Sequence, residues 1–322
     1  MINKNTKIFI AGHKGLVGSS IYTLLKKNNF KNIIVKSKSE LNLLDRKKVD
    51  KFFKNNKIEL VIFCAGLVGG IKANSTYSTE FFTQNMLMII NTLGSSHKYN
   101  VKNFINLGSA CIYPKNINRK LKESDLLTGE LEKTNEPYAL AKISSLKLCN
   151  YYRKQFNREY YSLMPANLFG KNDNFNLEKS HVIPALIRKF YEAKKFKSEK
   201  VEVFGDGNSI RDFLYVEDLA LAILFTVKNL HKKKFKQSIS KFGFLNVGCG
   251  KGVKIISIIN KIKKLSKFKG EIVFKNKTLN GTRFRVLSSS KLLSKGWKTK
   301  YSFDQGLKIT FDWYKNNTTK RN

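Results

Sequence analysis

The segment KIFIAGHKGLVGS, residues 7–19, decides the fold class of this chain. Residues 8–11 form an apolar run of the kind that builds a buried β-strand, and the residues after 15 place apolar side chains at helical spacing. Glycines at positions 12, 15 and 18 separate the two elements. In such a strand–turn–helix unit, glycine permits the tight turn and lets a pyrophosphate approach the helix N-terminus. We therefore expect a dinucleotide cofactor to bind at Gly12, Gly15, Leu16, Val17 and Gly18.

The rest of the chain continues this alternation of strands and helices. Apolar runs typical of buried strands lie at residues 32–35, 60–65, 103–109, 161–168 and 201–204, and helical patterns lie at 49–56, 80–97, 137–156 and 183–195. Alternating elements of these lengths predict an α/β fold, in which a Rossmann-type, doubly wound parallel sheet carries helices on both faces.

The alternation becomes irregular after residue 172, which predicts a smaller C-terminal α/β domain. We expect residues 1–172 with about 213–250 to form the dinucleotide-binding domain, and about 173–212 with 251–322 to form the substrate domain. The substrate should then lie at the carboxyl ends of the parallel strands, in the cleft that faces the second domain.

Composition excludes several classes of protein. Of the 322 residues, 42% are apolar, which is enough for a large core, yet no run approaches the roughly 20 apolar residues of a membrane span. The N-terminus carries no secretory segment, so we expect a cytoplasmic protein. The four cysteines lack the spacing of a disulfide framework or a metal site, and we expect no metal. The net charge of +38 comes from lysines spread along the whole chain, which indicates a compositional bias and no nucleic-acid partner.

The cofactor should be NADP(H) and not NAD. Proteins that bind NAD usually have an acidic residue about 20 residues beyond the glycine loop, where it binds the ribose hydroxyls. Here Lys14, Lys36 and Lys38 stand in the loop and after the second predicted strand, where they favour a 2′-phosphate. Asp45 is a candidate for the adenine edge, although a helix N-cap explains it nearly as well.

A reducing centre is indicated by three residues in the middle of the chain. Tyr138 and Lys142 are four residues apart in EPYALAK, so they share one helix face, and a lysine can stabilise the phenolate of a neighbouring tyrosine. Ser109 ends the predicted strand at 103–109, where its hydroxyl can hold a substrate carbonyl oxygen. Downstream of a dinucleotide loop, this combination is typical of hydride transfer to or from a carbonyl.

With these residues in place, the chain resembles the GDP-L-fucose synthase family of the extended short-chain dehydrogenase/reductase superfamily. The resemblance runs from about residue 8 to 313. The motifs that carry it are FIAGHKGLVGS (9–19), ELNLLD (40–45), VGGIKANSTY (68–77), GSACIYP (108–114), TNEPYALAKI (134–143), MPANLFGKNDNF (164–175), SHVIPALIRKF (180–190) and RDFLYVEDLA (211–220). VGGIKAN, GSACIYP and SHVIPAL are far more specific than the others.

The resemblance implies 3,5-epimerisation and then NADPH-dependent 4-reduction of GDP-4-keto-6-deoxy-D-mannose. Ser109, Tyr138 and Lys142 would form the reducing triad. Cys111 would remove the protons beside the ketone, and His181 would return them on the opposite face. Relatives usually form homodimers through two long helices, which in this chain would be the helices predicted at 80–97 and 137–156.

The resemblance also implies binding residues. We expect the cofactor to contact Lys142, Pro165, Asn167, Leu168 and His181 as well as the glycine loop. The nucleotide contacts map to Val182, Leu186, Lys189, Phe204, Arg211 and Arg285. Three of these depart from the family pattern, because Phe204 replaces a tryptophan, Lys189 an arginine and Arg285 a lysine. Guanine specificity is therefore less firmly indicated than the sugar chemistry.

Other readings of the same residues stay open. Another NADP-dependent nucleotide-sugar epimerase, reductase or dehydratase would also carry the glycine loop, the serine and the YxxxK pair. A cofactor-sensing regulator of the same fold would commonly lose the tyrosine or the lysine, and this chain keeps both. A basic nucleic-acid-binding protein would show salt-dependent affinity for DNA.

Overall fold

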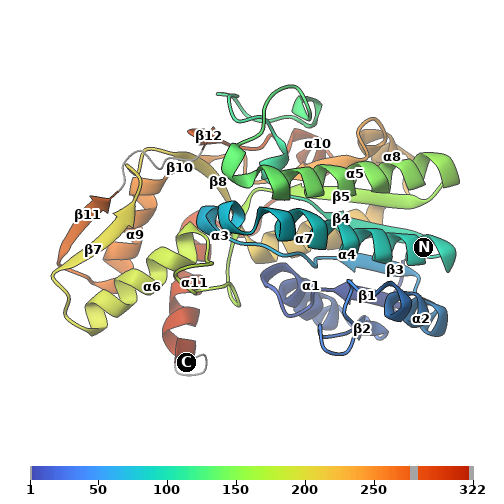
Figure 1. Cartoon of the computed structure of the whole chain (residues 1–322), viewed down its shortest axis with the longest axis horizontal. Coiled ribbons are helices and arrows are strands. Elements are labelled where there is room, and N and C mark those ends of the chain that lie inside the picture. Colours follow the sequence, from blue (N-terminus) through green and yellow to red (C-terminus); the bar gives the residue numbers. More distant parts are fainter. Residues whose placement is uncertain (1, 276–281, 319–322) are drawn as a thin grey trace.

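A six-stranded parallel sheet forms the centre of the computed structural model, which describes residues 2–275 and 282–318 (Figure 1). Its strands are β1 (Ile8–Ala11), β2 (Ile33–Val35), β3 (Leu60–Phe63), β4 (Asn103–Leu107), β5 (Glu159–Pro165) and β9 (Phe244–Val247), in the order β2-β1-β3-β4-β5-β9. The order reverses between β1 and β3. In sheets of this kind, ligands bind outside the carboxyl ends of the strands at that reversal.

Helices cover both faces of this sheet. One face carries α1 (Leu16–Lys27), α7 (Val216–Asn229) and α8 (Lys233–Ser240), and the other carries α2 (Arg46–Asn56), α4 (Ser78–Lys98) and α5 (Glu136–Phe156). The strand β1 shows the reason. Its side chains alternate, so that Ile8 and Ile10 join the cluster of α1 while Phe9 joins the cluster of α2 and α4. The predicted doubly wound fold is confirmed.

A second, smaller unit lies at the left of Figure 1 and has its own buried cluster. Its helices are α6 (Val182–Lys195), α9 (Ile255–Ser266) and α11 (Phe303–Asn317). Its strands form two small sheets, one of β7 (Lys200–Phe204) with β11 (Glu271–Lys275), the other of β6 (Asn167–Phe169), β8 (Ile210–Tyr215), β10 (Gly252–Lys254) and β12 (Phe284–Arg285). The strand predicted at 161–168 is thus divided between two sheets, because β5 ends at Pro165 and β6 begins at Asn167.

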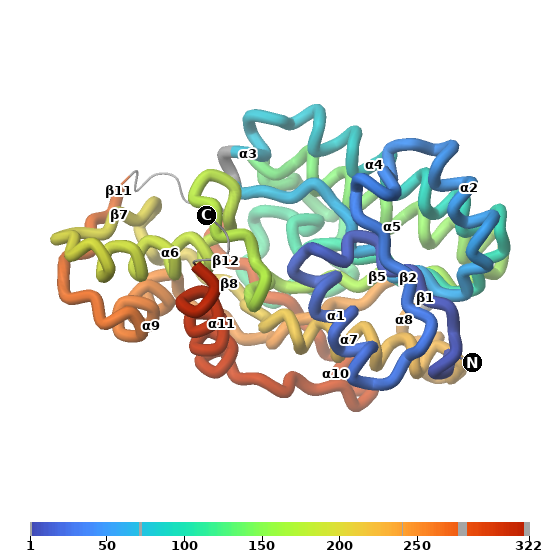
Figure 2. Tube along the Cα trace, turned by 90° about the horizontal axis from the view of Figure 1, so that it is seen from below, coloured from blue at the N-terminus to red at the C-terminus, as the bar shows by residue number. Residues whose placement is uncertain are grey.

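The C-terminal part of the chain packs into the buried clusters of both units. After β12, Leu287, Leu292 and Trp297 pack into the cluster of the large sheet, and Leu307 and Phe311 of α11 then pack into the second cluster. Figure 2 shows this path, with α11 beside α6, and α10 (Ser290–Leu293) contacts β9. The remaining elements are α3 (Ile71–Thr76) and the 3₁₀ helices η1 (Ala110–Ile112), η2 (Glu123–Asp125) and η3 (Lys133–Asn135).

Across the described ranges, none of the helices combines the length and the apolar character needed to cross a lipid bilayer.

Candidate active site

A cavity of about 1270 Å³ runs from the glycine loop, past the carboxyl ends of β3, β4 and β5, to the second unit. Nearly all residues predicted for the site line it. They are Gly12, Gly15, Leu16, Val17, Gly18, Lys36, Lys38, Ser109, Cys111, Tyr138, Lys142, Pro165, Asn167, Leu168, His181, Val182, Leu186, Lys189, Phe204, Arg211 and Arg285. Lys14 and Asp45 are the two exceptions among the predicted residues.

Close packing explains why the first turn needs glycine. Gly12 has a φ of +82°, and a Cβ atom on it would lie 2.8 Å from the backbone of Ala65. A Cβ atom on Gly18 would lie 2.2 Å from the carbonyl oxygen of Gly12. The loop and the first turn of α1 therefore approach each other as a pyrophosphate cradle requires, and the site fits a dinucleotide.

The segment after β2 holds a carboxylate as well as the lysines that the sequence singled out. Lys36 and Lys38 line the cavity, but Nζ of Lys36 lies 3.3 Å from Oε1 of Glu40, a carboxylate that the interpretation overlooked. Hydrogen bonds from Ser37 lower the pKa of Glu40 to about 2, so it stays charged. Lys14 is exposed and is not among the residues that line the cavity.

Asp45 performs the alternative role that the sequence left open. It is the N-cap of α2, and its Oδ1 accepts a hydrogen bond from the backbone N–H of Lys48 at 3.0 Å. This satisfies one of the free amides at the helix start. Asp45 therefore caps a helix, and it is not among the residues that line the cavity.

Tyr138 and Lys142 lie in the first turns of α5 with Ser109 at the end of β4. Nζ of Lys142 donates a hydrogen bond to the carbonyl of Leu107 at 2.9 Å and lies 5.6 Å from the ring centroid of Tyr138. Burial lowers the pKa of Lys142 to about 8, opposed by negative charge on the thiols of Cys111 and Cys64. The three polar groups line the same cavity.

Burial has the largest effect on the pKa of Tyr138. Burial raises the pKa of Tyr138 above its usual value, and charge on Cys111 raises it further. Lys142 instead directs its ammonium to the carbonyl of Leu107. The phenol therefore stays protonated at neutral pH, which suits a proton donor.

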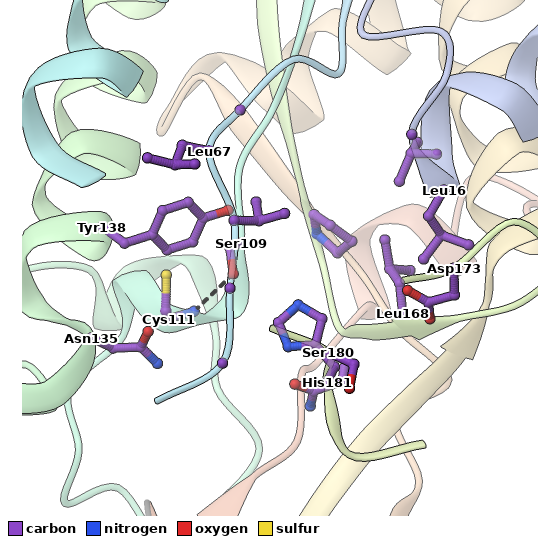
Figure 3. Close-up of a pocket in the computed structure, with 18 of the residues that line it drawn as sticks. Leu16, Leu67, Ser109, Cys111, Asn135, Tyr138, Leu168, Asp173, Ser180 and His181 are labelled. Carbon is purple, nitrogen blue, oxygen red and sulfur yellow. Dashed lines mark hydrogen bonds between the residues drawn. The ribbon is translucent and has the colours of Figure 1, made fainter. Parts of the chain in front are cut away.

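Cys111 sits in the η1 turn, directly beside this triad. The backbone N–H of Cys111 donates to Oγ of Ser109 at 3.4 Å, and Figure 3 shows Cys111 and Tyr138 on one side of the cavity with His181 across from them. Burial raises the pKa of the Cys111 thiol, while a hydrogen bond from Ser109 and the charges of Arg285 and Lys142 lower it. The thiol therefore has cationic neighbours on two sides.

His181 is the N-cap of α6 and belongs to the second unit. Its ring opens onto the cavity, so part of its surface is accessible, but the surrounding protein removes enough water to lower its pKa. The imidazole is consequently neutral at pH 7 and must gain a proton before it can act as an acid. The structure brings it to the same cavity as Cys111 although 70 residues separate them.

The nucleotide end of the cavity is cationic and partly aromatic. Arg211 of β8 and Arg285 of β12 are direct partners in the strand register. Nζ of Lys189 lies 4.8 Å from the ring centroid of Phe204, whose side chain is 61% exposed. Adjacent cations suit a diphosphate, and an exposed ring beside an ammonium group suits a stacked base.

Sequence reasoning missed three titratable groups on the wall of the cavity: Cys64, Glu132 and Asp173. Cys64 follows β3, and burial raises its pKa to about 12. Glu132 accepts hydrogen bonds from Thr134, and burial raises the pKa of Asp173 to about 7. The position of Cys64 at the end of a parallel strand was the available signal, whereas the other two lie in irregular segments.

Comparison with known proteins agrees with this site. The chain matches the NAD dependent epimerase/dehydratase family over residues 8–239, and it belongs to that family. Within the family its full-length likeness is to GDP-L-fucose synthases, which confirms the resemblance carried by its motifs.

Two curated relatives illustrate that likeness. A putative GDP-L-fucose synthase 2 of Arabidopsis thaliana is 42% identical over 100% of this chain and 95% of its own length. The GDP-L-fucose synthase of Escherichia coli strain K12 is 40% identical, with 97% of both chains covered.

Solved structures place the fold in the same group. A GDP-6-OMe-4-keto-L-xylo-heptose reductase from C. jejuni matches with a TM-score of 0.91 and 32% identity, over 98% of this chain and 99% of that one. A GDP-L-fucose synthetase from Naegleria fowleri bound to NADP matches with a TM-score of 0.87 and 26% identity, over 99% and 96%.

Proposed function

We propose that this protein is a GDP-L-fucose synthase, which epimerises GDP-4-keto-6-deoxy-D-mannose at C3 and C5 and then reduces C4 with NADPH. One observation carries the proposal: Ser109, Tyr138 and Lys142 share a single cavity with Cys111 and His181. The first three residues suffice for a reductase. A thiol and an imidazole on the same cavity supply the base and the acid that two inversions require.

The epimerisation depends on the ketone at C4. Protons at C3 and C5 become acidic when the enolate oxygen is stabilised, and the hydroxyls of Ser109 and Tyr138 are the donors for that oxygen. Cys111, as thiolate, removes a proton from one face of the sugar ring. His181, on the opposite wall, must first be protonated to imidazolium and then gives its proton to the carbon from the other face, which inverts the centre.

The reduction uses the same hydroxyls. NADPH, when bound, supplies the hydride that C4 receives. Tyr138 donates its proton to the C4 oxygen, and its raised pKa means that this proton is present at neutral pH. Lys142 offsets the negative charge that is left on the phenolate.

Binding of the substrate is assigned to the second unit. The diphosphate would contact Arg211 and Arg285, and the base would stack on Phe204 beside Lys189. These contacts support the expected division into a cofactor domain and a substrate domain. The excess of lysine would attract the negatively charged substrate over longer distances.

Exposed apolar side chains on two helices bear on the proposed quaternary state. The long helices α4 and α5 pack against each other and expose Phe82, Leu87, Ile90, Leu140, Tyr151 and Phe156. Apolar side chains gathered on two adjacent helices support a homodimer through these helices.

A second candidate is a 4-reductase of a GDP-heptose, favoured by the TM-score of 0.91 to such an enzyme. The experiment that separates the two is to incubate purified protein with GDP-4-keto-6-deoxy-D-mannose and NADPH, to follow cofactor absorbance, and to identify the product sugar by NMR. GDP-L-fucose is the expected product. A product that keeps the original configuration at C3 and C5 would contradict the proposal.

A further inference from the structure

Arg285 connects the second unit to the turn that carries the thiol. Its Nη1 donates a hydrogen bond to the carbonyl of Ala110 at 2.9 Å, and its Nη2 donates one to Oγ1 of Thr282 at 2.8 Å. Ala110 directly precedes Cys111 in η1. The side chain of Arg285 is 7% exposed, so the two hydrogen bonds are shielded from water and hold the guanidinium in one orientation.

The charge of Arg285 also acts on the thiol. Arg285 and Lys142 are cations that lower the pKa of Cys111, with Arg285 as the stronger influence. Lys142 has a pKa of about 8, so its own charge is partly lost in mildly alkaline solution. An arginine keeps its charge throughout this range, because its pKa is far higher.

The chemistry at this position favours arginine over the lysine expected from the family pattern. A guanidinium presents several N–H donors in a planar fork, whereas an ammonium is a single nitrogen on a flexible stem. One nitrogen cannot reach the carbonyl of Ala110 and the hydroxyl of Thr282 in the same bidentate way. A lysine would therefore keep the charge near Cys111 but lose one of the two anchors.

We propose that Arg285 is a positioning residue for the epimerisation steps: its guanidinium fixes the η1 turn and keeps a positive charge beside Cys111, so that the thiolate is held where it can remove the sugar protons. This role rests on the proposed function and goes beyond a contact to the nucleotide. The thiolate takes a proton and becomes a thiol, while the electron pair of the C–H bond passes into the enolate.

The first test needs no sugar substrate. Alkylation of Cys111 by iodoacetamide is measured against pH in the cofactor-free protein, with the modified peptide identified by mass and Cys111→Ser as the blank. Arg285→Gln should slow alkylation at pH 7 about tenfold, which corresponds to a thiol pKa about one unit higher. An unchanged pH profile in Arg285→Gln would overturn the electrostatic part of the proposal.

Arg211→Gln is the matched control for this test. Arg211 is the register partner of Arg285 and also lines the cavity, but it is not among the groups with the largest influence on the pKa of Cys111. Its loss should leave the alkylation profile unchanged. Equal slowing in Arg211→Gln and Arg285→Gln would show a general effect of positive potential and would count against a specific role for Arg285.

The second test separates positioning from nucleotide binding. Deuterium incorporation at C3 and C5 is followed in D₂O with saturating GDP-4-keto-6-deoxy-D-mannose and NADP⁺. Arg285→Lys, which keeps the charge, should alkylate nearly as wild type but exchange protons about tenfold more slowly at saturation, a loss equivalent to about 1.4 kcal/mol. A raised KM with an unchanged exchange rate at saturation would reduce Arg285 to a nucleotide contact.

The experiments distinguish failure of the proposed function from failure of the role of Arg285. If the wild-type protein incorporates no deuterium and makes no GDP-L-fucose, the epimerase assignment falls, while the alkylation experiment still reports whether Arg285 controls the thiol. Arg285→Lys also guards against misfolding of Arg285→Gln, and NADPH binding by each variant checks that the cofactor half is intact. Wild-type behaviour of Arg285→Lys in both measurements would exclude the need for two anchors.

Discussion

The ammonium group of Lys142 lies over the ring of Tyr138, 5.6 Å from its centroid. Four-residue spacing on α5 brings the two side chains together, and the carbonyl of Leu107 at the end of β4 then directs the lysine. The tyrosine consequently keeps its proton, with a pKa raised by burial. The reducing half of the site is therefore prepared to donate a proton to a ketone.

Replacement of this phenol should separate the two reactions. Tyr138→Phe removes the proton donor for the C4 oxygen, so NADPH oxidation should fall at least about a hundredfold. Proton exchange at C3 and C5 should survive in part, because Ser109 still stabilises the enolate. Cofactor absorbance and deuterium NMR on the same sample measure both. Complete loss of exchange together with reduction would contradict this division.

The titration of Lys142 predicts an alkaline limit. Its pKa of about 8 is below the ordinary value, so its charge is present below pH 8 and lost as the pH rises through that value. The kcat/KM for reduction should then fall about tenfold per pH unit on the alkaline side. Lys142→Arg remains charged and should extend activity to higher pH. An alkaline limb that is identical in both proteins would assign the limit to another group.

The epimerising pair should be independent of the reducing triad. Cys111→Ser removes the base, and deuterium exchange at C3 and C5 should drop about a hundredfold while reduction of a ketone that needs no inversion continues. Exchange at the wild-type rate in this variant would remove Cys111 from the mechanism.

His181 allows a complementary test. His181→Asn keeps a polar side chain of similar size but cannot return a proton, so both inversions should slow. The burial that lowers the pKa of His181 also predicts that exchange in the wild-type protein weakens as imidazolium is lost with rising pH. Full epimerase activity in His181→Asn would reduce this residue to a packing role.

Cofactor preference should depend on lysines inside the cavity and not on the one outside it. Lys38→Ala should lower the kcat/KM ratio of NADPH to NADH about tenfold, the order expected for one charge-assisted contact to the 2′-phosphate. Lys14→Ala, which changes an exposed lysine off the wall, is the control and should leave the ratio unchanged. A lower ratio in Lys14→Ala with an unchanged ratio in Lys38→Ala would mean that Lys14 binds the 2′-phosphate.

The association state provides a test at the surface. Ile90 is exposed on α4, and Ile90→Glu should convert a dimer to a monomer in analytical ultracentrifugation, because a carboxylate cannot be buried there unpaired. Phe196→Glu changes an equally apolar exposed side chain at the end of α6 and should leave the dimer intact. A wild-type monomer at micromolar concentration would refute the interface.

Local sequence pattern was sufficient to predict many elements of the large parallel-sheet unit. The apolar run before Gly12, the four-residue spacing of Tyr138 and Lys142, and the periodicity of α4 and α5 are short-range features, because strand alternation, helix faces and tight turns depend on neighbouring residues. These elements appear in the structure within a few residues of their predicted bounds. Ser109, Tyr138 and Lys142 could accordingly be proposed as a triad from chain order and spacing alone.

Tertiary structure decided what depends on distant partners. The strand β9 joins the edge of the sheet beside β5, about 80 residues earlier in the chain, and no local pattern singled it out. The sequence suggested the same role for Lys14 and Lys38. In the fold, Lys38 lines the cavity and Lys14 does not.

The contact between Arg285 and Ala110 joins residues 175 apart, and with it the charge beside Cys111. The sequence by itself determined the kind of sheet, the cofactor turn and the reducing helix, because these follow from short-range sterics and hydrophobic periodicity. Only the tertiary structure decided which cation lies near the thiol of Cys111. Electrostatic interactions act through space and depend on burial, and spacing along the sequence specifies neither.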